Sequence, residues 1–185
     1  MLIGLTGPNA AGKGEVASFL VSRGFRVHSL SDIVREEAVA RGLGTEREHL
    51  IRVGNDLRRQ WGAGVLAERV LPRLTGRDVV DSIRNPAEVA VLRRAKGFFL
   101  IAVDAPEEVR LERLLRRSRP GDPQTLRELR RRERQENSRD PDAQQLLATF
   151  RLADRVLRND GPIVDLRAAV EELLAAAAEG GGSAP

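Results

Sequence analysis

A glycine-rich loop near the start of the chain constrains its fold more than any other stretch. Residues 7–13 read Gly-Pro-Asn-Ala-Ala-Gly-Lys, which has the spacing G-x-x-x-x-G-K. An apolar run at residues 2–5 precedes the loop, and Val16, Phe19 and Leu20 share one helical face after it. The sequence therefore predicts a buried strand, a tight loop and a helix in immediate succession.

The loop has the composition of a phosphate-binding P-loop. Glycine lets the backbone curl so that successive N–H groups point at an anion, and the following helix adds the positive end of its dipole. Lys13 adds a full charge, and the only other lysine is Lys96, in a chain whose Lys and Arg total 31. The alternative is an ordinary strand-to-helix turn with a solvated lysine. We expect nucleotide phosphates to contact Gly7, Asn9, Ala10, Ala11, Gly12, Lys13, Gly14 and Glu15.

The residues after the lysine depart from the usual pattern. A P-loop normally continues with a Ser or Thr whose hydroxyl binds Mg²⁺, but Gly14 and Glu15 follow here. Mg²⁺ must then be held in another way, through water and a carboxylate. Asp81 ends the apolar pair at residues 79–80, as the acid of a Walker B strand does, while Asp104 ends another apolar run and competes for this role. We prefer Asp81 as the Mg²⁺ residue, directly or through water, because Arg84 accompanies it; a strand-end cap is the alternative.

Composition narrows the class of protein. With 185 residues, 41% hydrophobic and 3% aromatic, we expect one globular domain with an aliphatic core. The absence of cysteine excludes thiol chemistry, and two histidines argue against a histidine-built metal site. No signal peptide or membrane span is visible, so we expect a cytoplasmic protein without a membrane partner. The net charge of +4 admits nucleic acid as a partner. The few aromatics disfavour it, and arginines that bind small phosphorylated molecules explain the charge as well.

Strand and helix patterns alternate along the chain. A capping box of Thr45 and Glu48 predicts a helix that starts there and ends near Gln60. We expect the following Trp61 to be buried, with stacking on a base as the alternative. Five alternations predict an α/β fold with a five-stranded parallel sheet flanked by helices. We expect a single domain over residues 1–179 and a disordered tail at 180–185. The expected strands lie at residues 2–6, 25–30, 77–84, 98–104 and 155–158.

Two basic regions are candidates for ligand binding. Asp32 and Arg35 share a helical face just after a strand, where ligands bind in open α/β sheets; a helix cap with a solvated arginine is the alternative. They belong to helices at about residues 31–74, which we expect to bind the acceptor. The arginine-rich segment at about 116–137 is either a solvated face or a small basic lid that closes over phosphates. From this segment we select Arg116 and Arg119 as candidate catalytic residues.

With these residues the chain resembles the adenylate kinase-like nucleoside-phosphate kinases. Residues 32–35 resemble their Asp-x-x-Arg segment, and residues 81–84 look like their Asp-Gly-x-x-Arg segment without the glycine. The P-loop resembles theirs through Gly14 and differs at Glu15. Residues 153–161 are similar to the last loop of dephospho-CoA kinases, which implies an adenine-side position for Asn159 and Gly161.

A closer resemblance is to small P-loop proteins labelled AAA-family ATPase or dephospho-CoA kinase-like, and to the kinase-like segment of some dCMP deaminases. The stretches that carry it are residues 31–38, 81–89, 121–125, and 136–137 together with 140–145. The deaminase signature, His-x-Glu with Cys-x-x-Cys, is absent from the sequence, which excludes deamination by this chain.

The resemblance implies a P-loop NTPase of the nucleoside monophosphate kinase-like class, which transfers a phosphoryl group from ATP, with Mg²⁺, to a small phosphorylated acceptor. A nucleoside or deoxynucleoside monophosphate fits this class. Dephospho-CoA is an alternative acceptor, and a non-kinase nucleotide switch, a slow ATPase module or a nucleic-acid-associated ATPase are alternative functions. The sequence gives no oligomeric state. The catalytic candidates are Lys13, Asp81, Arg84, Arg116 and Arg119, and the acceptor-binding candidates are Asp32, Arg35, Arg58 and Arg84.

Overall fold

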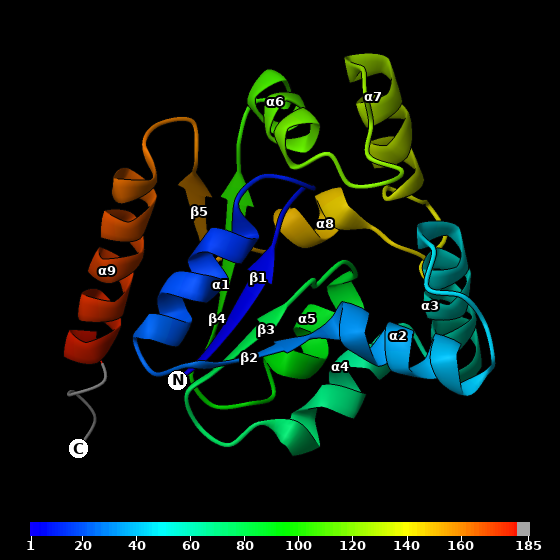
Figure 1. The fold of residues 1–185 in the computed structure, drawn as a ribbon. Coiled ribbons are helices and arrows are strands. Elements are labelled where there is room, and N and C mark those ends of the chain that lie inside the picture. Colours follow the sequence, from blue (N-terminus) through cyan, green and yellow to red (C-terminus); the bar gives the residue numbers. More distant parts are fainter. Residues whose placement is uncertain (181–185) are drawn as a thin grey trace.

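Five parallel strands form one sheet, and the computed structural model, which describes residues 1–180, places them in the order β2-β3-β1-β4-β5 (Figure 1). Leu2 of the central strand pairs with Asp78 on one side and Phe98 on the other. This confirms the predicted fold class, with β1 at the point where the strand order changes direction. The strands are β1 (Leu2–Thr6), β2 (Arg26–Ser29), β3 (Asp78–Asp81), β4 (Phe98–Asp104) and β5 (Arg155–Arg158).

Helices connect the strands, as parallel pairing requires. A 3₁₀ turn, η1 (Leu71–Arg73), continues α4. None of the helices within residues 1–180 has the length and apolarity needed to cross a membrane. The helices are α1 (Lys13–Ser22), α2 (Leu30–Ala40), α3 (Arg47–Trp61), α4 (Val65–Val70), α5 (Pro86–Leu92), α6 (Glu107–Arg117), α7 (Leu126–Gln135), α8 (Leu146–Phe150) and α9 (Ile163–Gly180).

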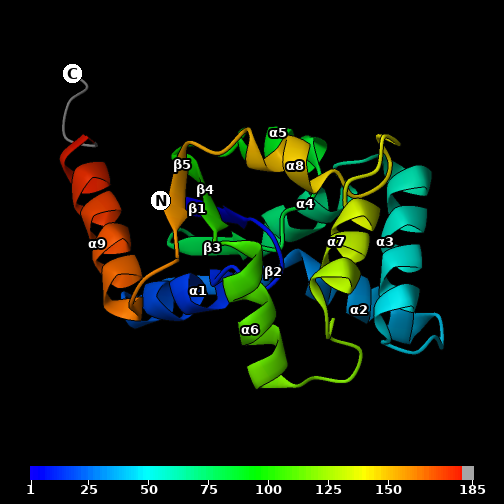
Figure 2. The same ribbon diagram turned by 90° about the horizontal axis from the view of Figure 1, so that it is seen from above.

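Two aliphatic cores cover the two faces of the sheet. Figure 2 shows α1 and α9 on one side of it and α5 and α8 on the other. On the first side Leu5 packs with Leu20 and other residues of one cluster; on the second Val80 packs with Leu92 in the other. All five residues of β1 are buried, and burial on both faces explains why Leu2–Leu5 are apolar.

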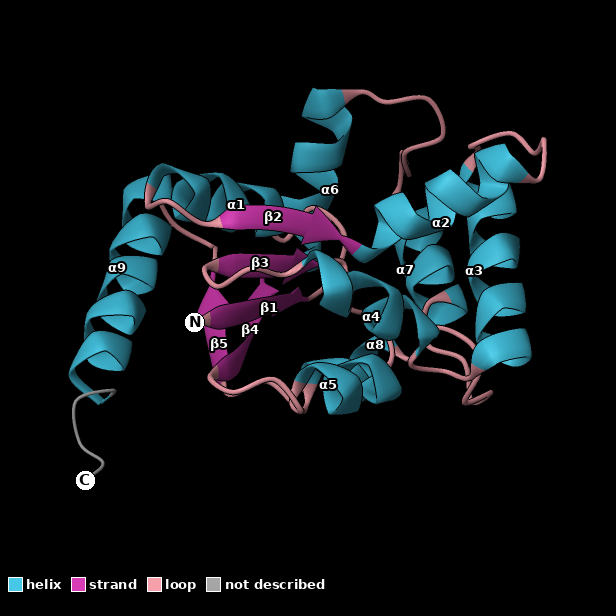
Figure 3. Ribbon diagram, turned by 90° about the horizontal axis from the view of Figure 1, so that it is seen from below, coloured by secondary structure: helices cyan, strands magenta, loops and turns pink. Residues whose placement is uncertain are grey.

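The carboxyl ends of the strands are not covered in this way. In Figure 3 the arrowheads of β1, β2 and β3 point toward α2, α3 and α7, which project beyond the sheet. Loops at the carboxyl edge therefore open between the sheet and these helices, where ligands bind in open α/β folds.

Two local predictions about α3 were wrong. The helix begins at Arg47 after Glu46, and no side chain caps it, so the box of Thr45 and Glu48 does not form. Trp61 is 60% exposed instead of buried, because it ends a helix at the periphery, where the chain turns away at Gly62. The tail expected at residues 180–185 lies outside the described residues except for Gly180, which ends α9.

Candidate active site

The P-loop joins β1 to α1 in a tight, closed conformation. Gly7, Ala10 and Gly12 have positive φ angles of 129°, 61° and 113°. A Cβ atom on Gly7 would lie 2.1 Å from the carbonyl oxygen of Val103, and one on Gly12 would lie 2.0 Å from Nδ2 of Asn159. Both the backbone angles and the available space therefore require glycine at these two positions.

Asn159 and Arg113 support this loop from the side of β5 and α6. Nδ2 of the buried Asn159 donates to the carbonyl oxygen of Ala11 at 2.7 Å. Arg113 donates from Nη2 to the carbonyl oxygen of Asn159 at 2.9 Å and from Nη1 to that of Ala10 at 3.3 Å. Asn159, expected beside the adenine, thus holds the P-loop itself, while Gly161 lines the adjacent cleft. Sequence reasoning missed Arg113, because nothing local separates it from the other arginines of α6.

Lys13 is the first residue of α1, and its side chain folds over the loop. Nζ donates to the carbonyl oxygens of Gly7 at 2.7 Å and Pro8 at 2.8 Å. The ammonium group therefore lies above the curled backbone, where an anion on the loop would meet it.

The electrostatic surroundings of Lys13 include the other principal candidates. Burial, followed by the positive charge of Arg84, lowers the pKa of Lys13 from 10.5 to about 8, and Arg110 acts in the same direction. The carboxylates of Asp81 and Glu136 act in the opposite direction. The structure thus brings Lys13, Asp81 and Arg84 together, although they lie far apart in the sequence.

Asp81 stands at the carboxyl end of β3 with one oxygen engaged. Its Oδ2 accepts a hydrogen bond from the hydroxyl of Ser82 at 3.2 Å, while its Oδ1 is buried without a hydrogen-bond partner among the described residues. Asp81 lines a large cleft beside the P-loop, whereas Asp104 is not among the residues within 1–180 that line this cleft. The structure therefore favours Asp81 over its competitor as the carboxylate beside the P-loop.

The surroundings of Asp81 suit Mg²⁺ bound through water. Mg²⁺ usually keeps several waters and takes one or two carboxylates together with substrate phosphates. No group of three or more potential metal-ligating side chains occurs in the part of the chain that the structure describes. A Cβ on Gly14 would meet no heavy atom within 4 Å, and the Glu15 carboxylate, about half exposed, lies 4.0 Å from Arg167.

A large basic cleft opens above these groups. It has a volume of about 1990 Å³ and extends from the P-loop over α2 and α3 to α6 and α7. Basic side chains outnumber the acidic ones, which are Glu15, Glu46, Glu48, Asp81, Asp122 and Glu136. The cleft is therefore suited to a ligand with several negative charges. The basic residues that line it are Lys13, Arg35, Arg58, Arg84, Arg113, Arg116, Arg117, Arg119, Arg131, Arg132 and Arg167.

The acceptor-side candidates separate into two groups. Arg35 and Arg84 line the cleft, where Arg35 pairs with Asp32 and Nη1 of Arg84 lies 2.8 Å from Oε2 of Glu136. Asp32 is exposed and, among the described residues, is not one that lines the cleft. Its carboxylate instead orients the guanidinium of Arg35.

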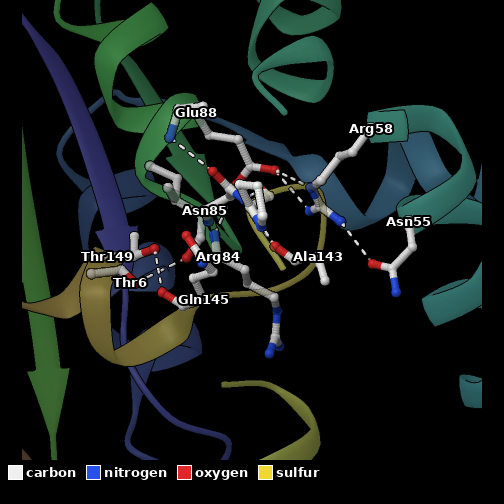
Figure 4. A network of polar contacts seen from close by, with 12 residues as sticks. Thr6, Asn55, Arg58, Arg84, Asn85, Glu88, Ala143, Gln145 and Thr149 are labelled. Carbon is white, nitrogen blue, oxygen red and sulfur yellow. Dashed lines mark hydrogen bonds and ion pairs between the residues drawn. The ribbon is translucent and has the colours of Figure 1, made fainter. Parts of the chain in front are cut away.

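Arg58 is buried in an ion pair and holds the loop that carries Arg84 (Figure 4). Its Nη2 lies 2.8 Å from Oε1 of Glu88, and both side chains are nearly inaccessible. Oε2 of Glu88 accepts from the backbone N–H groups of Arg84 at 2.8 Å and Asn85 at 3.1 Å. Because its guanidinium is already paired with Glu88, we do not assign Arg58 a role as a phosphate ligand.

The same network ties the chain after α7 to this loop. Nδ2 of Asn85 donates to the carbonyl oxygens of Pro141 at 2.7 Å and Ala143 at 2.8 Å, and Gln145 N–H donates to that of Arg84 at 2.8 Å. Asn85 and Glu88 also form the capping box of α5. The sequence Asn-Pro-x-Glu was a signal from which their pairing could have been predicted.

The basic segment at 116–137 borders the cleft as α7 and its preceding loop. Arg110 pairs with Glu133, and Nε of Arg130 lies 2.6 Å from Oε2 of Glu107, so α7 is attached to α6. Arg116 and Arg119 both line the cleft, but Arg116 is largely exposed and pairs with Glu112 at 2.5 Å.

Comparison with known proteins places the chain in a family. A family model described as "AAA domain" matches residues 6–145. A UPF0200 protein of Hyperthermus butylicus is 38% identical over 137 residues, which cover 72% of this chain and 74% of that protein. This chain belongs to the UPF0200 family and carries an AAA domain. Solved structures show what fold this UPF0200 member shares with other proteins.

The UPF0200 member is similar in structure to TT1252 from Thermus thermophilus, with 27% identity, a TM-score of 0.60, and coverage of 95% of this chain and 96% of that one. Shikimate kinase from Aquifex aeolicus shares the fold at 18% identity and a TM-score of 0.53, over 99% of this chain and all of that one (100%). The UPF0200 member therefore shares its fold with a shikimate kinase. Its resemblance to dephospho-CoA kinases and to the dCMP deaminase segment stays a prediction.

Proposed function

We propose that this protein transfers the γ-phosphoryl group of ATP to a small acceptor of the nucleotide type. The observation that carries the proposal is the convergence of Lys13, Asp81 and Arg84 beside a closed P-loop, at the floor of an arginine-lined cleft. Phosphoryl transfer depends mainly on positioning and on electrostatic stabilisation of the transferred group, and this arrangement supplies both.

Each part of the cleft has a role in the proposal. The backbone of the P-loop would hold the ATP phosphates, with Lys13 at the β- and γ-phosphates. Arg35 and Arg84 would bind an anionic group of the acceptor, since both line the cleft. Arg116 and Arg119 would approach the phosphates from the lid. Asp81 would hold Mg²⁺ through water, and the ion would supply neutralisation of the phosphate charge.

The test is ADP formation from ATP and Mg²⁺ with a panel of ribo- and deoxynucleoside monophosphates and dephospho-CoA. We expect one acceptor to stimulate ADP formation and Lys13→Ala to abolish it. Lys96→Ala is the matched control, because Lys96 is the only other lysine, is exposed, and lies on the turn before β4. Circular dichroism checks that both variants are folded, and unchanged turnover in Lys13→Ala would refute the proposal.

A separate observation supports each of two alternative functions. The similarity of residues 153–161 to dephospho-CoA kinases favours dephospho-CoA as the acceptor, and the panel tests it directly. The pair Gly14 and Glu15, which replaces the metal-binding hydroxyl, favours a nucleotide switch or slow ATPase module. ATP binding without acceptor-dependent turnover anywhere on the panel would support that module.

A further inference from the structure

A row of hydroxyl groups connects Arg35 with Asp81 along the floor of the cleft. Nη1 of Arg35 donates to Oγ of Ser31 at 3.1 Å, and Oγ of Ser31 lies 2.8 Å from Oγ of Ser29. Oγ of Ser29 donates to Oγ of Ser82 at 3.2 Å, which in turn donates to Oδ2 of Asp81 at 3.2 Å. The row thus joins the start of α2 to the ends of β2 and β3.

The direction of this row is fixed by its two ends. A guanidinium can only donate and an ionised carboxylate can only accept, and each serine has one hydrogen to give. Arg35 therefore donates to Ser31, and each hydroxyl passes its hydrogen to the next until Asp81 accepts the last one. Hydrogen bonds aligned in this way reinforce one another, so the row holds Asp81 in one orientation.

Ser82 adopts an unfavourable backbone conformation at its position in the row. Its φ angle is 65°, in the left-handed region that residues other than glycine and asparagine rarely adopt. Such conformations persist where the surroundings impose them, and they are common at functional sites. The backbone turn at Ser82 aims its hydroxyl at Oδ2 of Asp81, which leaves Oδ1 without a partner among residues 1–180.

A second oxygen in the cleft lacks a hydrogen-bond donor. Oε1 of Gln144 is buried and, within the described residues, has no hydrogen-bond partner, and Gln144 lines the same cleft as Asp81. Buried acceptor atoms without a donor are rare and costly, so each calls for a donor from a ligand or water. Most charged side chains of the cleft are arginines, so these two oxygens indicate a ligand that carries O–H or N–H groups besides its negative charge.

We propose, on the basis of the proposed function, that the acceptor attacks through a hydroxyl group, which donates its hydrogen bond to Oδ1 of Asp81. An anionic phosphate oxygen would be repelled by this free carboxylate oxygen and needs no base, whereas a hydroxyl must lose its proton to attack. The acceptor is thus an alcohol with a separate anionic group that Arg35 and Arg84 bind. Gln144 accepts from a second O–H or N–H of the same molecule.

The transfer is balanced in atoms and charge. The acceptor oxygen forms a bond to the γ-phosphorus of ATP as the bond from that phosphorus to the β,γ-bridging oxygen breaks. The hydroxyl proton passes to Oδ1 of Asp81 and then to solvent, and ADP leaves with the bridging oxygen. The product is a phosphomonoester of the acceptor. In this step Asp81 is the catalytic residue, and Ser82 and Ser29 are positioning residues that act through it.

The first experiment identifies the new bond. The acceptor that most stimulates ADP formation is converted by the unaltered protein, and ³¹P NMR distinguishes a phosphomonoester from a phosphoanhydride. We expect a phosphomonoester, and no turnover of the matching 2′,3′-dideoxynucleoside monophosphate when the acceptor is a nucleotide. An anhydride product, or full activity on the dideoxy compound, would overturn the alcohol assignment and leave the kinase function intact. No stimulation by any acceptor would refute the proposed function, and this inference with it.

The second experiment tests the row of hydroxyls. Ser82→Gly keeps the left-handed backbone and removes the hydroxyl, and Ser29→Ala removes the preceding donor. We expect kcat to fall about tenfold in each, the rate equivalent of one lost hydrogen bond, with KM for ATP unchanged. Ser18→Ala, an exposed serine of α1, is the control and should retain kcat. An unchanged kcat in both cleft variants, or a loss confined to KM, would show that the row does not position Asp81.

Discussion

Asn159 and Ala11, 148 positions apart in the sequence, are joined by a hydrogen bond of 2.7 Å from the Asn159 amide to the Ala11 carbonyl oxygen. The same asparagine presents its backbone carbonyl to Arg113. The shape of the P-loop therefore depends on a loop near the other end of the chain.

Asn159→Ala should weaken both the fold and nucleotide binding. The substitution removes the shorter of two hydrogen bonds to the carbonyl oxygen of Ala11 and leaves the 3.4 Å bond from Nη1 of Arg113, at a cost of about 0.5–1.5 kcal/mol. Urea denaturation measures the free energy of unfolding, and calorimetry measures the affinity for ATP. Asn55→Ala on α3 is the control, because Asn55 only receives a 3.5 Å contact from Arg58. Unchanged ATP affinity in Asn159→Ala would contradict a supporting role for this residue.

ATP affinity should depend on pH through Lys13. Burial and Arg84 lower the pKa of Lys13 to about 8 in the protein without nucleotide, so the ammonium form is lost above that pH. Since the phosphates bind the protonated form, affinity should be steady below about pH 8 and fall by up to about tenfold per pH unit above it. Lys13→Arg stays protonated and should bind with a flat profile over this range. A flat profile in the unaltered protein up to about pH 9.5 would contradict the lowered pKa.

Asp78 should contribute to acid sensitivity. Burial alone raises the pKa of Asp78, but hydrogen bonds from the backbone N–H groups of Thr75 and Gly76 and from His28 outweigh it, so the net pKa lies below 3.8. The carboxylate of Asp78 therefore binds a proton more readily in the unfolded chain than in the folded protein. The stabilisation is present above about pH 4 and is lost as pH falls through the folded-state pKa. Asp78→Asn should lower the free energy of unfolding near neutral pH and flatten its acid dependence, which denaturation at several pH values measures. The exposed Asp165→Asn should leave that dependence as it is.

Glu88→Gln should be strongly destabilising. It leaves the buried guanidinium of Arg58 without a countercharge, and breaking a buried pair from one side costs about 3–5 kcal/mol. Asp56→Asn, which removes an exposed pair with Arg59 at 3.8 Å, should cost less than about 1 kcal/mol. The denaturant guanidinium chloride is a salt and would screen the ion pairs, so urea is the better denaturant. Equal midpoints for Glu88→Gln and Asp56→Asn would show that the buried pair does not hold the loop of Arg84.

Much of the architecture was predictable because it depends on local patterns. β1 occupies residues 2–6 as predicted, and the five-stranded parallel sheet is confirmed. Buried strands carry their pattern in their own residues, and parallel pairing follows from their alternation with helices. The P-loop was equally visible, because its G-x-x-x-x-G-K spacing is local, although the groups that exclude a Cβ at Gly7 and Gly12 belong to Val103 and Asn159.

The rest of the site depends on contacts that no local pattern encodes. Arg58 and Arg84 look alike in the sequence and both line the cleft, but the guanidinium of Arg58 is held in a buried ion pair with Glu88. The capping box at Thr45 failed because the N-cap of α3 is Glu46, one residue later than predicted. The roles of the individual site residues, the acceptor, Mg²⁺ and the cytoplasmic location stay predictions.

The open space beside Gly14 would allow the missing hydroxyl to be introduced into this P-loop. Nothing lies within 4 Å of a Cβ built there, so the serine that other P-loops carry could be restored by one substitution without displacing a neighbour. Other P-loops supply both the phosphate-binding backbone and a metal-binding hydroxyl from one segment. In this chain the segment has the phosphate-binding backbone without the hydroxyl after Lys13. The contributions of these two groups to nucleotide chemistry could thus be added one at a time on the same scaffold.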